Sequence, residues 1–126
     1  MKTMVCFRAG DGHFAVPVES TIGVRTSEGI ASLPGSHRDV VGVMVGQPPL
    51  TVLSTLGEGR DHVLVLSVDG VHFGLLVHNV LGVLCVREED VGPPPEGQRK
   101  DYVTGSLTIA DNLVLVADPR TLRGRL

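Results

Sequence analysis

An internal repeat constrains the fold of this chain more than any other feature of its sequence. Residues 7–24 align without a gap with residues 66–83, so that the pair His13-Phe14 falls on the pair His72-Phe73. Further along this alignment Val, Gly and Val coincide, at positions 18, 23 and 24 of the first copy and at 77, 82 and 83 of the second. A repeated segment is expected to fold into a repeated structural unit.

The repeat continues beyond a linker that is four residues longer in the second copy. Residues 40–44 align with residues 103–107, and residues 50–53 with residues 113–116. We therefore predict a single domain over residues 1–126, made of two related halves at approximately residues 4–57 and 62–122.

Each half has the pattern of short strands joined by turns. An apolar run, an Asp-Gly turn (Asp11-Gly12 or Asp69-Gly70) and a second apolar run together predict a β-hairpin. The 16 glycines and 8 prolines divide the Val- and Leu-rich runs further, as at Leu33-Pro34-Gly35. About five strands per half are expected, and a five-stranded sheet can cover its edges by curling into a barrel. The predicted fold is all-β, with two packed five-stranded barrels of SH3-like or OB-like type and little helix.

Some segments carry more specific signals. Residues 63–68 and 113–117 are apolar at nearly every position, which predicts strands covered on both faces, for example at the junction between barrels. Glu88-Glu89-Asp90 is expected to form one helical turn. Asp118-Pro119 has the pattern of an N-cap followed by Pro at the first helical position, which predicts a short helix.

Charge and cysteine content restrict the partners and the compartment. The chain has 11 basic and 14 acidic residues, a net charge of −3, and no basic run that could follow a phosphate backbone, so nucleic acid is not an expected partner. The sequence has neither a secretory signal pattern nor an apolar stretch long enough to cross a membrane, and a cytoplasmic location without membrane insertion is predicted. Cys6 and Cys85 lie in apolar runs and are interpreted as reduced core thiols.

No residue pattern in the chain indicates catalysis, a metal site or a cofactor site. The five histidines lack a metal-ligand spacing, and no serine lies in a Gly-x-Ser-x-Gly motif. Gly10-Asp11-Gly12 precedes a strand instead of opening a helix, unlike a phosphate-binding loop. Binding to another protein is the leading interpretation. The alternative is a barrel that senses a small ligand, with His37 and His78 as polar contacts.

The order of three segments resembles the CheW-like domain family over nearly the whole chain. The first segment is residues 14–24, with Phe-Ala-Val-Pro-Val-Glu followed by Ile-Gly-Val. The second is Leu33-Pro34-Gly35 followed by Val-Gly-Val-Met at residues 41–44, and the third is Gly-Leu-Leu-Val at 74–77 with Val-Leu-Gly-Val at 80–83. The resemblance implies two five-stranded barrels and a chemotaxis adaptor. Its implied partners are the regulatory domain of a CheA-type histidine kinase, through one barrel, and the cytoplasmic hairpin tip of chemoreceptors, through the groove between barrels.

Contact residues can be assigned by matching segments of this chain to those of the family. The residues so predicted to contact a partner protein are Val16, Val18, Ile22, Val24, Gly42, Val43, Met44, Val80 and Val83. The chain departs from the family pattern after Met44, where Val-Gly-Gln-Pro-Pro replaces the usual Asn-Leu-Arg-Gly. An arginine supplies planar, bidentate contacts, so its loss changes what this loop can bind. An accessory chemosensory system therefore fits this chain better than the standard one.

Overall fold

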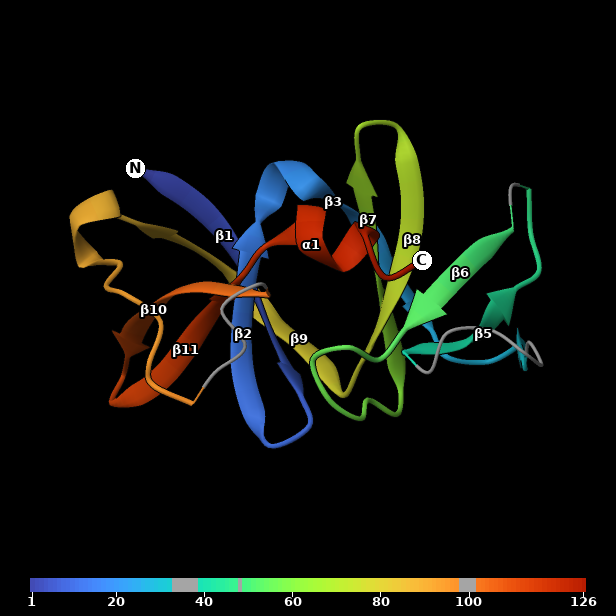
Figure 1. The fold of residues 1–126 in the computed structure, drawn as a ribbon, viewed down its shortest axis with the longest axis horizontal. Helices are drawn as coiled ribbons and strands as arrows, with labels where there is room; N and C mark the ends of the chain where they lie inside the picture. The colour runs from blue at the N-terminus through green and yellow to red at the C-terminus, as the bar shows by residue number, and fades with distance from the viewer. Residues whose placement is uncertain (33–38, 48, 98–101) are drawn as a thin grey trace.

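The fold consists of two β-sheets packed side by side, with almost no helix (Figure 1). The computed structural model describes residues 1–32, 39–47, 49–97 and 102–126. The elements, in chain order, are β1 (Lys2–Ala9), β2 (Gly12–Pro17), the 3-10 turn η1 (Val18–Ser20), β3 (Thr21–Thr26), β4 (Ile30–Ala31), β5 (Val40–Met44), β6 (Leu50–Leu53), β7 (His62–Val68), β8 (Val71–Val77), β9 (Asn79–Val86), η2 (Glu88–Asp90), β10 (Val103–Ile109), β11 (Asn112–Ala117) and α1 (Pro119–Arg123).

The two sheets share one strand order. The first sheet, called sheet A, runs β10-β11-β2-β1-β9, and the second, sheet B, runs β4-β5-β6-β8-β7-β3. With β1 matched to β7, β2 to β8, β9 to β3, β10 to β5 and β11 to β6, the two orders agree except for the additional strand β4. Both sheets also contain one parallel pairing at the same place, β11 with β2 and β6 with β8. The aligned halves of the sequence therefore pair their strands in the same way.

The halves exchange their first hairpins, because β1 and β2 lie in sheet A with β9, β10 and β11, whereas β7 and β8 lie in sheet B with β3, β4, β5 and β6. After β2 the chain passes through η1 into β3, which pairs with β7 of sheet B, and after β8 it passes into β9, which pairs with β1 of sheet A. Each sheet thus combines strands from both halves of the sequence. No pairing among the described residues joins β9 to β10 or β3 to β4, so the predicted closed, five-stranded barrels are not confirmed.

The core has three parts, and β1 and β7 separate them. One cluster lies between the two sheets and includes Phe7 of β1 and Leu66 of β7, both fully buried. A second cluster lies inside sheet A and includes Cys6. The third lies inside sheet B and includes Val65. Both central strands are therefore covered on two faces, as the apolar run at residues 63–68 predicted.

The short helical elements agree with their sequence signals. Residues 88–90 form η2, and α1 begins at Pro119, after Asp118, whose side chain accepts a hydrogen bond from the Arg120 backbone N–H at 3.0 Å. The helix buries Leu122 completely in the cluster between the sheets. Beyond it, Arg125 Nε donates to Asp39 Oδ2 at 2.9 Å, and the Arg125 guanidinium lies 5.2 Å from the centre of the Tyr102 ring. The chain's last residues thereby link the two sheets.

Two local predictions are wrong. The first hairpin turns at Gly10-Asp11, because Ala9 pairs with Gly12, one residue earlier than the predicted Asp11-Gly12. Cys85 is exposed, because its side chain lies on the outer face of β9, so only Cys6 is a core thiol. The turn predicted at Leu33-Pro34-Gly35 and the histidine at position 37 lie outside the described residues.

Candidate interaction surface

A β-bulge in β3 turns an isoleucine out of the sheet. Thr21 pairs with Leu66 of β7, and Gly23 with the next residue of β7, Val65, which leaves Ile22 as an extra residue. A bulge inserts one residue into a ladder, bends the strand and changes the direction of a side chain. The Ile22 side chain is 53% exposed as a result.

The same bulge occurs in β9. Cys6 of β1 pairs with Gly82, and the next residue, Phe7, pairs with Val80, so Leu81 is the extra residue. Leu81 is the residue that aligns with Ile22 in the repeat, and it is 51% exposed. The two halves therefore present a large aliphatic side chain from equivalent bulges.

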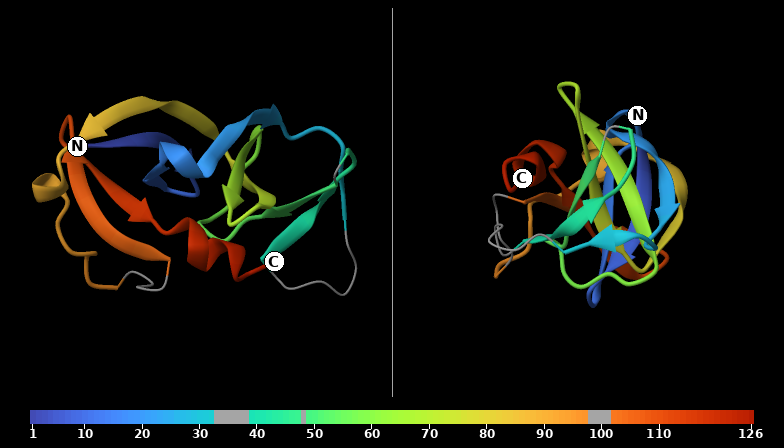
Figure 2. Two further views of the ribbon diagram at one scale, coloured as in Figure 1. Left: turned by 90° about the horizontal axis from the view of Figure 1, so that it is seen from above. Right: turned by 90° about the vertical axis from the view of Figure 1, so that its right-hand side faces the viewer.

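A second pair of aliphatic side chains lies two residues beyond the bulges. Val24 of β3 is 48% exposed and Val83 of β9 is 62% exposed. Both strands are at the edge of their sheets, and they run along the same side of the molecule, opposite α1 (Figure 2). We call Ile22, Val24, Leu81 and Val83 the aliphatic patch. Several exposed aliphatic side chains on one side of a soluble domain make that side a candidate interaction site.

The aliphatic patch contains three of the nine residues predicted as contacts. Ile22, Val24 and Val83 are exposed, whereas Val18, Val43 and Val80 are half-buried and offer only part of their side chains. Val18 and Val80 pack against the cluster between the sheets. The sequence prediction did not include Leu81, although its alignment with Ile22 in the repeat was a signal that could have identified it.

Three of the predicted contact residues are buried, and the prediction is corrected there. Val16 is fully buried between the sheets, and Met44 is 3% exposed inside sheet B. Gly42 is buried because its own chain passes over it: an added Cβ would collide with the Ala31 carbonyl oxygen and lie 2.9 Å from Ile30 Cγ2. The close approach that this glycine permits is therefore to β4, and not to a partner.

The segment that differs from the family pattern, residues 44–49, joins β5 to β6 at one end of sheet B. Val45 is 81% exposed there, and Pro48 lies outside the described residues. The exposed Val45 follows the half-buried Val43 by two residues, so both present apolar surface at this end of the molecule.

Of the histidines that the structure describes, His13 lies in β2 of sheet A, whereas His62 and His72 lie at opposite ends of the β7–β8 hairpin of sheet B. His62 Nδ1 lies 3.0 Å from the His78 carbonyl oxygen, and His78 lines an open hollow beside the Gly10 turn. Among residues 1–32, 39–47, 49–97 and 102–126 there is no group of three His, Cys, Asp or Glu side chains that could hold a metal ion. Within those same ranges, no helix is long and apolar enough to cross a bilayer.

Comparisons with known proteins agree with this geometry. A family model described as "CheW-like domain" matches residues 3–125. The structure is similar to the crystal structure of a scaffolding protein, TtCheW from Thermoanaerobacter tengcongensis, with a TM-score of 0.80 and 18% sequence identity. The match covers 93% of this chain and 88% of the other. A search of curated protein sequences gave no match.

Proposed function

The chain belongs to the CheW-like domain family, and on that premise we propose that it is a non-enzymatic chemotaxis adaptor that couples a CheA-type histidine kinase to chemoreceptors. The single observation that supports this role best is the aliphatic patch. Four exposed aliphatic side chains at equivalent positions of two edge strands are costly to leave in water unless a partner covers them.

The aliphatic patch is assigned to the chemoreceptor. The resemblance to the family implies that the receptor's hairpin tip binds between the two halves, and β3 and β9 are the first strands after the chain crosses from one sheet to the other. A helical hairpin is an antiparallel pair of helices and presents apolar side chains from both. Ile22 with Val24 and Leu81 with Val83 provide two equivalent apolar surfaces for it.

The kinase regulatory domain is assigned to the end of sheet B, at Val43 and Val45. This segment lacks the arginine that the family usually has, so the contact depends on apolar side chains instead of a guanidinium. Loss of a charged anchor is expected to reduce the dependence of kinase binding on ionic strength.

The aliphatic patch can be tested with two leucines of equal exposure. Leu81→Asp places a carboxylate in the patch, and Leu113→Asp places one on β11, where Leu113 is 53% exposed. Binding of the purified receptor tip from the same organism is measured by isothermal titration calorimetry. We expect Leu81→Asp to weaken binding at least tenfold, because a buried carboxylate without a partner is costly, and Leu113→Asp to change it less than twofold.

Two outcomes would contradict this assignment. One is equal affinity of the Leu81→Asp and Leu113→Asp variants for the receptor tip. The other is failure of the unmodified protein to bind either the receptor tip or the kinase regulatory domain at tens of micromolar, which would remove the coupling role. Thermal unfolding of both variants establishes that the fold is retained.

A further inference from the structure

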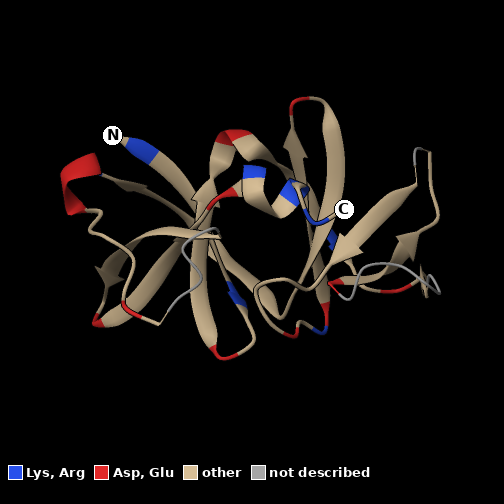
Figure 3. Ribbon diagram, in the orientation of Figure 1, with Lys and Arg blue, Asp and Glu red and all other residues tan. Residues whose placement is uncertain are grey.

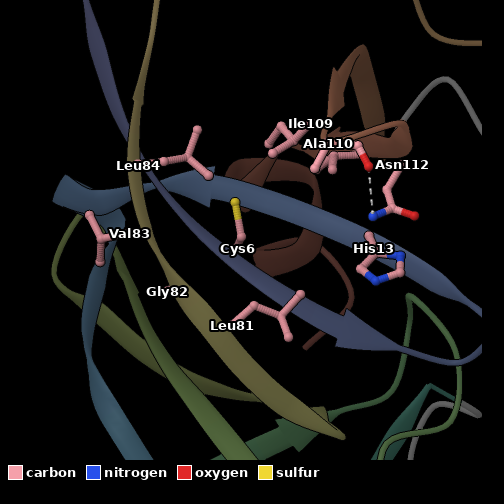
Figure 4. Close-up of a pocket in the computed structure, with 10 residues that line it drawn as sticks. Cys6, His13, Leu81, Gly82, Val83, Leu84, Ile109, Ala110 and Asn112 are labelled. Atoms are coloured by element: carbon pink, nitrogen blue, oxygen red, sulfur yellow. Dashed lines mark hydrogen bonds between the residues drawn. The ribbon is translucent and has the colours of Figure 1, made fainter.

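A hollow in sheet A adjoins the aliphatic patch, because Leu81 and Val83 are among the residues that line it, but the function proposed above makes no use of the hollow itself. It has a volume of about 260 Å³ and lies between the free edges of β9 and β10 (Figure 4). Its walls are mostly apolar: Leu84 of β9, Ile109 of β10 and Val114 of β11, with the Cys6 thiol between them. His13 and Asn112 supply polar groups at one end, and Asn112 Nδ2 lies 3.5 Å from the Ala110 carbonyl oxygen.

The hollow opens into a longer groove. A second hollow of about 580 Å³ lies between the same two strands and shares Leu84 and Ile109 with the first. Both strands are at the ends of the pairing order of sheet A, so their outer backbone groups are not used within the sheet. A free strand edge is a template for pairing with another extended chain.

Sheet B indicates what can cover such an edge. The strand of sheet B that is equivalent to β10 is β5, and β4 pairs with it through Ile30 to Met44 and Ala31 to Val43. The Ile30 side chain packs against the cluster inside sheet B. The occupant of this edge is therefore a short extended segment with an aliphatic side chain that points inwards.

In sheet A the equivalent cover is incomplete. Gly92 makes a single bridge to Ser106, with backbone N–O distances of 2.8 and 3.1 Å. The strand β10 continues for three residues beyond Ser106, to Ile109; all three line the 580 Å³ hollow, and Ile109 also lines the 260 Å³ hollow. Within the part of the chain that the structure describes, no strand pairs with residues 107–109 on this edge, which lies beside both hollows.

The groove is acidic at both ends (Figure 3). Asp90 lines the larger hollow, next to Glu88 and Glu89 in η2, and Asp111 lies in the β10–β11 turn between two residues that line the smaller hollow. Arg87 pairs with Glu89 at 3.5 Å and with Asp90 at 3.2 Å, so this one cation offsets only part of the charge of the three carboxylates in η2. None of the described residues that line either hollow is Lys or Arg.

We propose that this groove binds an extended, basic segment of a partner protein, whose backbone pairs with residues 107–109 of β10 and whose apolar side chain enters the hollow above Cys6. Strand addition of this kind derives affinity from main-chain hydrogen bonds and specificity from a side-chain pocket. The carboxylates at the two ends attract the Lys or Arg residues that flank the apolar side chain. Receptor binding by the aliphatic patch is not required for this interaction.

The test uses fluorescein-labelled nonapeptides with Lys at both ends and alternating Thr and Val between them. The central residue is Leu, Phe or Asp, and a fourth peptide carries Leu together with N-methyl groups on alternate amides. Fluorescence anisotropy is expected to give dissociation constants on the order of 10–100 μM for Leu and Phe. The Asp and N-methylated peptides are expected to bind at least tenfold more weakly, because they lose the apolar anchor and the backbone pairing.

Variants of the protein locate the site. Cys6→Leu adds bulk to the hollow and is expected to weaken binding of the Leu peptide at least fivefold. The double variant Asp90→Asn, Asp111→Asn is expected to weaken binding of the Leu peptide about threefold at low salt. No effect is expected at 0.5 M salt, because salt screens exposed charges. The matched control, Glu19→Gln with Glu28→Gln, removes two exposed carboxylates outside the groove and is expected to have no effect.

Hydrogen exchange gives an independent readout, because pairing protects the amides of residues 107–109. The proposal is overturned if neither the Leu nor the Phe peptide binds at 1 mM, if the N-methylated peptide binds as well as its parent, or if protection appears at β3 instead. Cys6→Leu is expected to leave the receptor titration unchanged. Failure of peptide binding is therefore distinguishable from failure of the coupling role.

Discussion

The two sheets are built from equivalent strands, but they treat their edges differently. In sheet B the edge of β5 is covered by β4, and Ile30 completes the cluster inside the sheet. In sheet A the equivalent edge has one bridge, at Gly92, and a hollow of about 260 Å³ beyond it. The repeated framework has thus given one sheet whose edge is covered by the chain itself and one whose edge is covered at a single bridge among the described residues.

The difference follows from a few positions. At the equivalent of Leu84, which lines the hollow in sheet A, the first half has the charged Arg25. At the equivalent of Cys6 the second half has Val65, which is buried inside sheet B. Strand β10 is also two residues longer than β5, seven against five, and so extends past its cover. Side-chain size and strand length, and not topology, decide which edge is open.

The largest effect is expected from two glycines that occupy equivalent positions below these covers. In Gly42→Ala the new Cβ meets backbone, the carbonyl group of Ala31, which can move only if β4 leaves β5. In Gly105→Ala it meets Val91 Cγ1 at 2.7 Å, the end of a side chain that can rotate, and the Gly92 carbonyl oxygen at 3.1 Å, a contact that a shift of a few tenths of an ångström relieves. Overpacking costs about 1–3 kcal/mol and exceeds the gain of about 0.4–1 kcal/mol from a less flexible unfolded chain.

We therefore expect Gly42→Ala to lower the free energy of unfolding by about 2–3 kcal/mol and Gly105→Ala by about 1 kcal/mol or less. Urea denaturation of both variants measures the difference. Equal losses, or a larger loss for Gly105→Ala, would mean that the two covers are equivalent and that the distinction between the sheets is wrong.

The sequence predicted the hairpins and the short helical elements well, because these depend on local patterns. Three kinds of local signal correspond to elements of the structure. They are the hairpin signals beside residues 13–14 and 72–73, the N-cap at Asp118, and the run at residues 63–68 that is apolar at nearly every position. Each of these patterns expresses a preference of neighbouring residues, so no knowledge of distant contacts was needed.

The contact surface was harder to predict, because β9 is apolar on both faces. Its sequence, from Asn79 to Val86, has no alternation of polar and apolar residues that would distinguish the inner face from the outer one. Leu84 and Val86 pack inside sheet A, whereas Leu81, Val83 and Cys85 are exposed. The bulge at Leu81 arises from pairing with β1, more than 70 residues away in the sequence, and has no local signal. The same long-range dependence explains why Gly42 was assigned to a partner instead of β4.

A smaller effect is expected from the hairpin turns. The β7–β8 turn has Asp69-Gly70, with φ of 51° and 80°, whereas the β10–β11 turn has Ala110-Asp111, with φ of 49° and 66°. The left-handed conformation costs about 1–2 kcal/mol for a residue with a Cβ and little for glycine. Replacing such a residue by glycine removes this cost, but the greater conformational freedom of glycine in the unfolded chain offsets part of the gain in stability.

Ala110→Gly is accordingly expected to raise the free energy of unfolding by about 0.5–1 kcal/mol. Ala31→Gly, in the exposed strand β4, serves as the control and is expected to lower it by a similar amount, because glycine weakens a strand where φ is ordinary. Thermal and urea unfolding of both variants show whether each change raises or lowers the free energy of unfolding. A loss of stability in Ala110→Gly would show that the turn carries no backbone strain.

The smallest effect concerns Cys6, a core position where sheet A has a titratable group and sheet B has none. Burial raises the pKa of the Cys6 thiol above its ordinary value of 9.0, whereas Val65, its equivalent in sheet B, cannot ionise. In the unfolded chain the thiol loses its proton near the ordinary value, and in the folded protein it keeps the proton to higher pH. Above pH 9 the unfolded state therefore binds fewer protons than the folded state, and the free energy of unfolding falls as the pH rises through that range. Cys6→Val makes sheet A like sheet B at this position and is expected to remove the part of the stability loss at alkaline pH that comes from Cys6. Cys85 is present in both proteins, so its contribution does not affect the comparison. Urea unfolding of the parent and the variant between pH 7 and pH 11 measures the difference, and parallel stability curves over that range would show that the Cys6 thiol ionises as readily in the folded protein as in the unfolded chain.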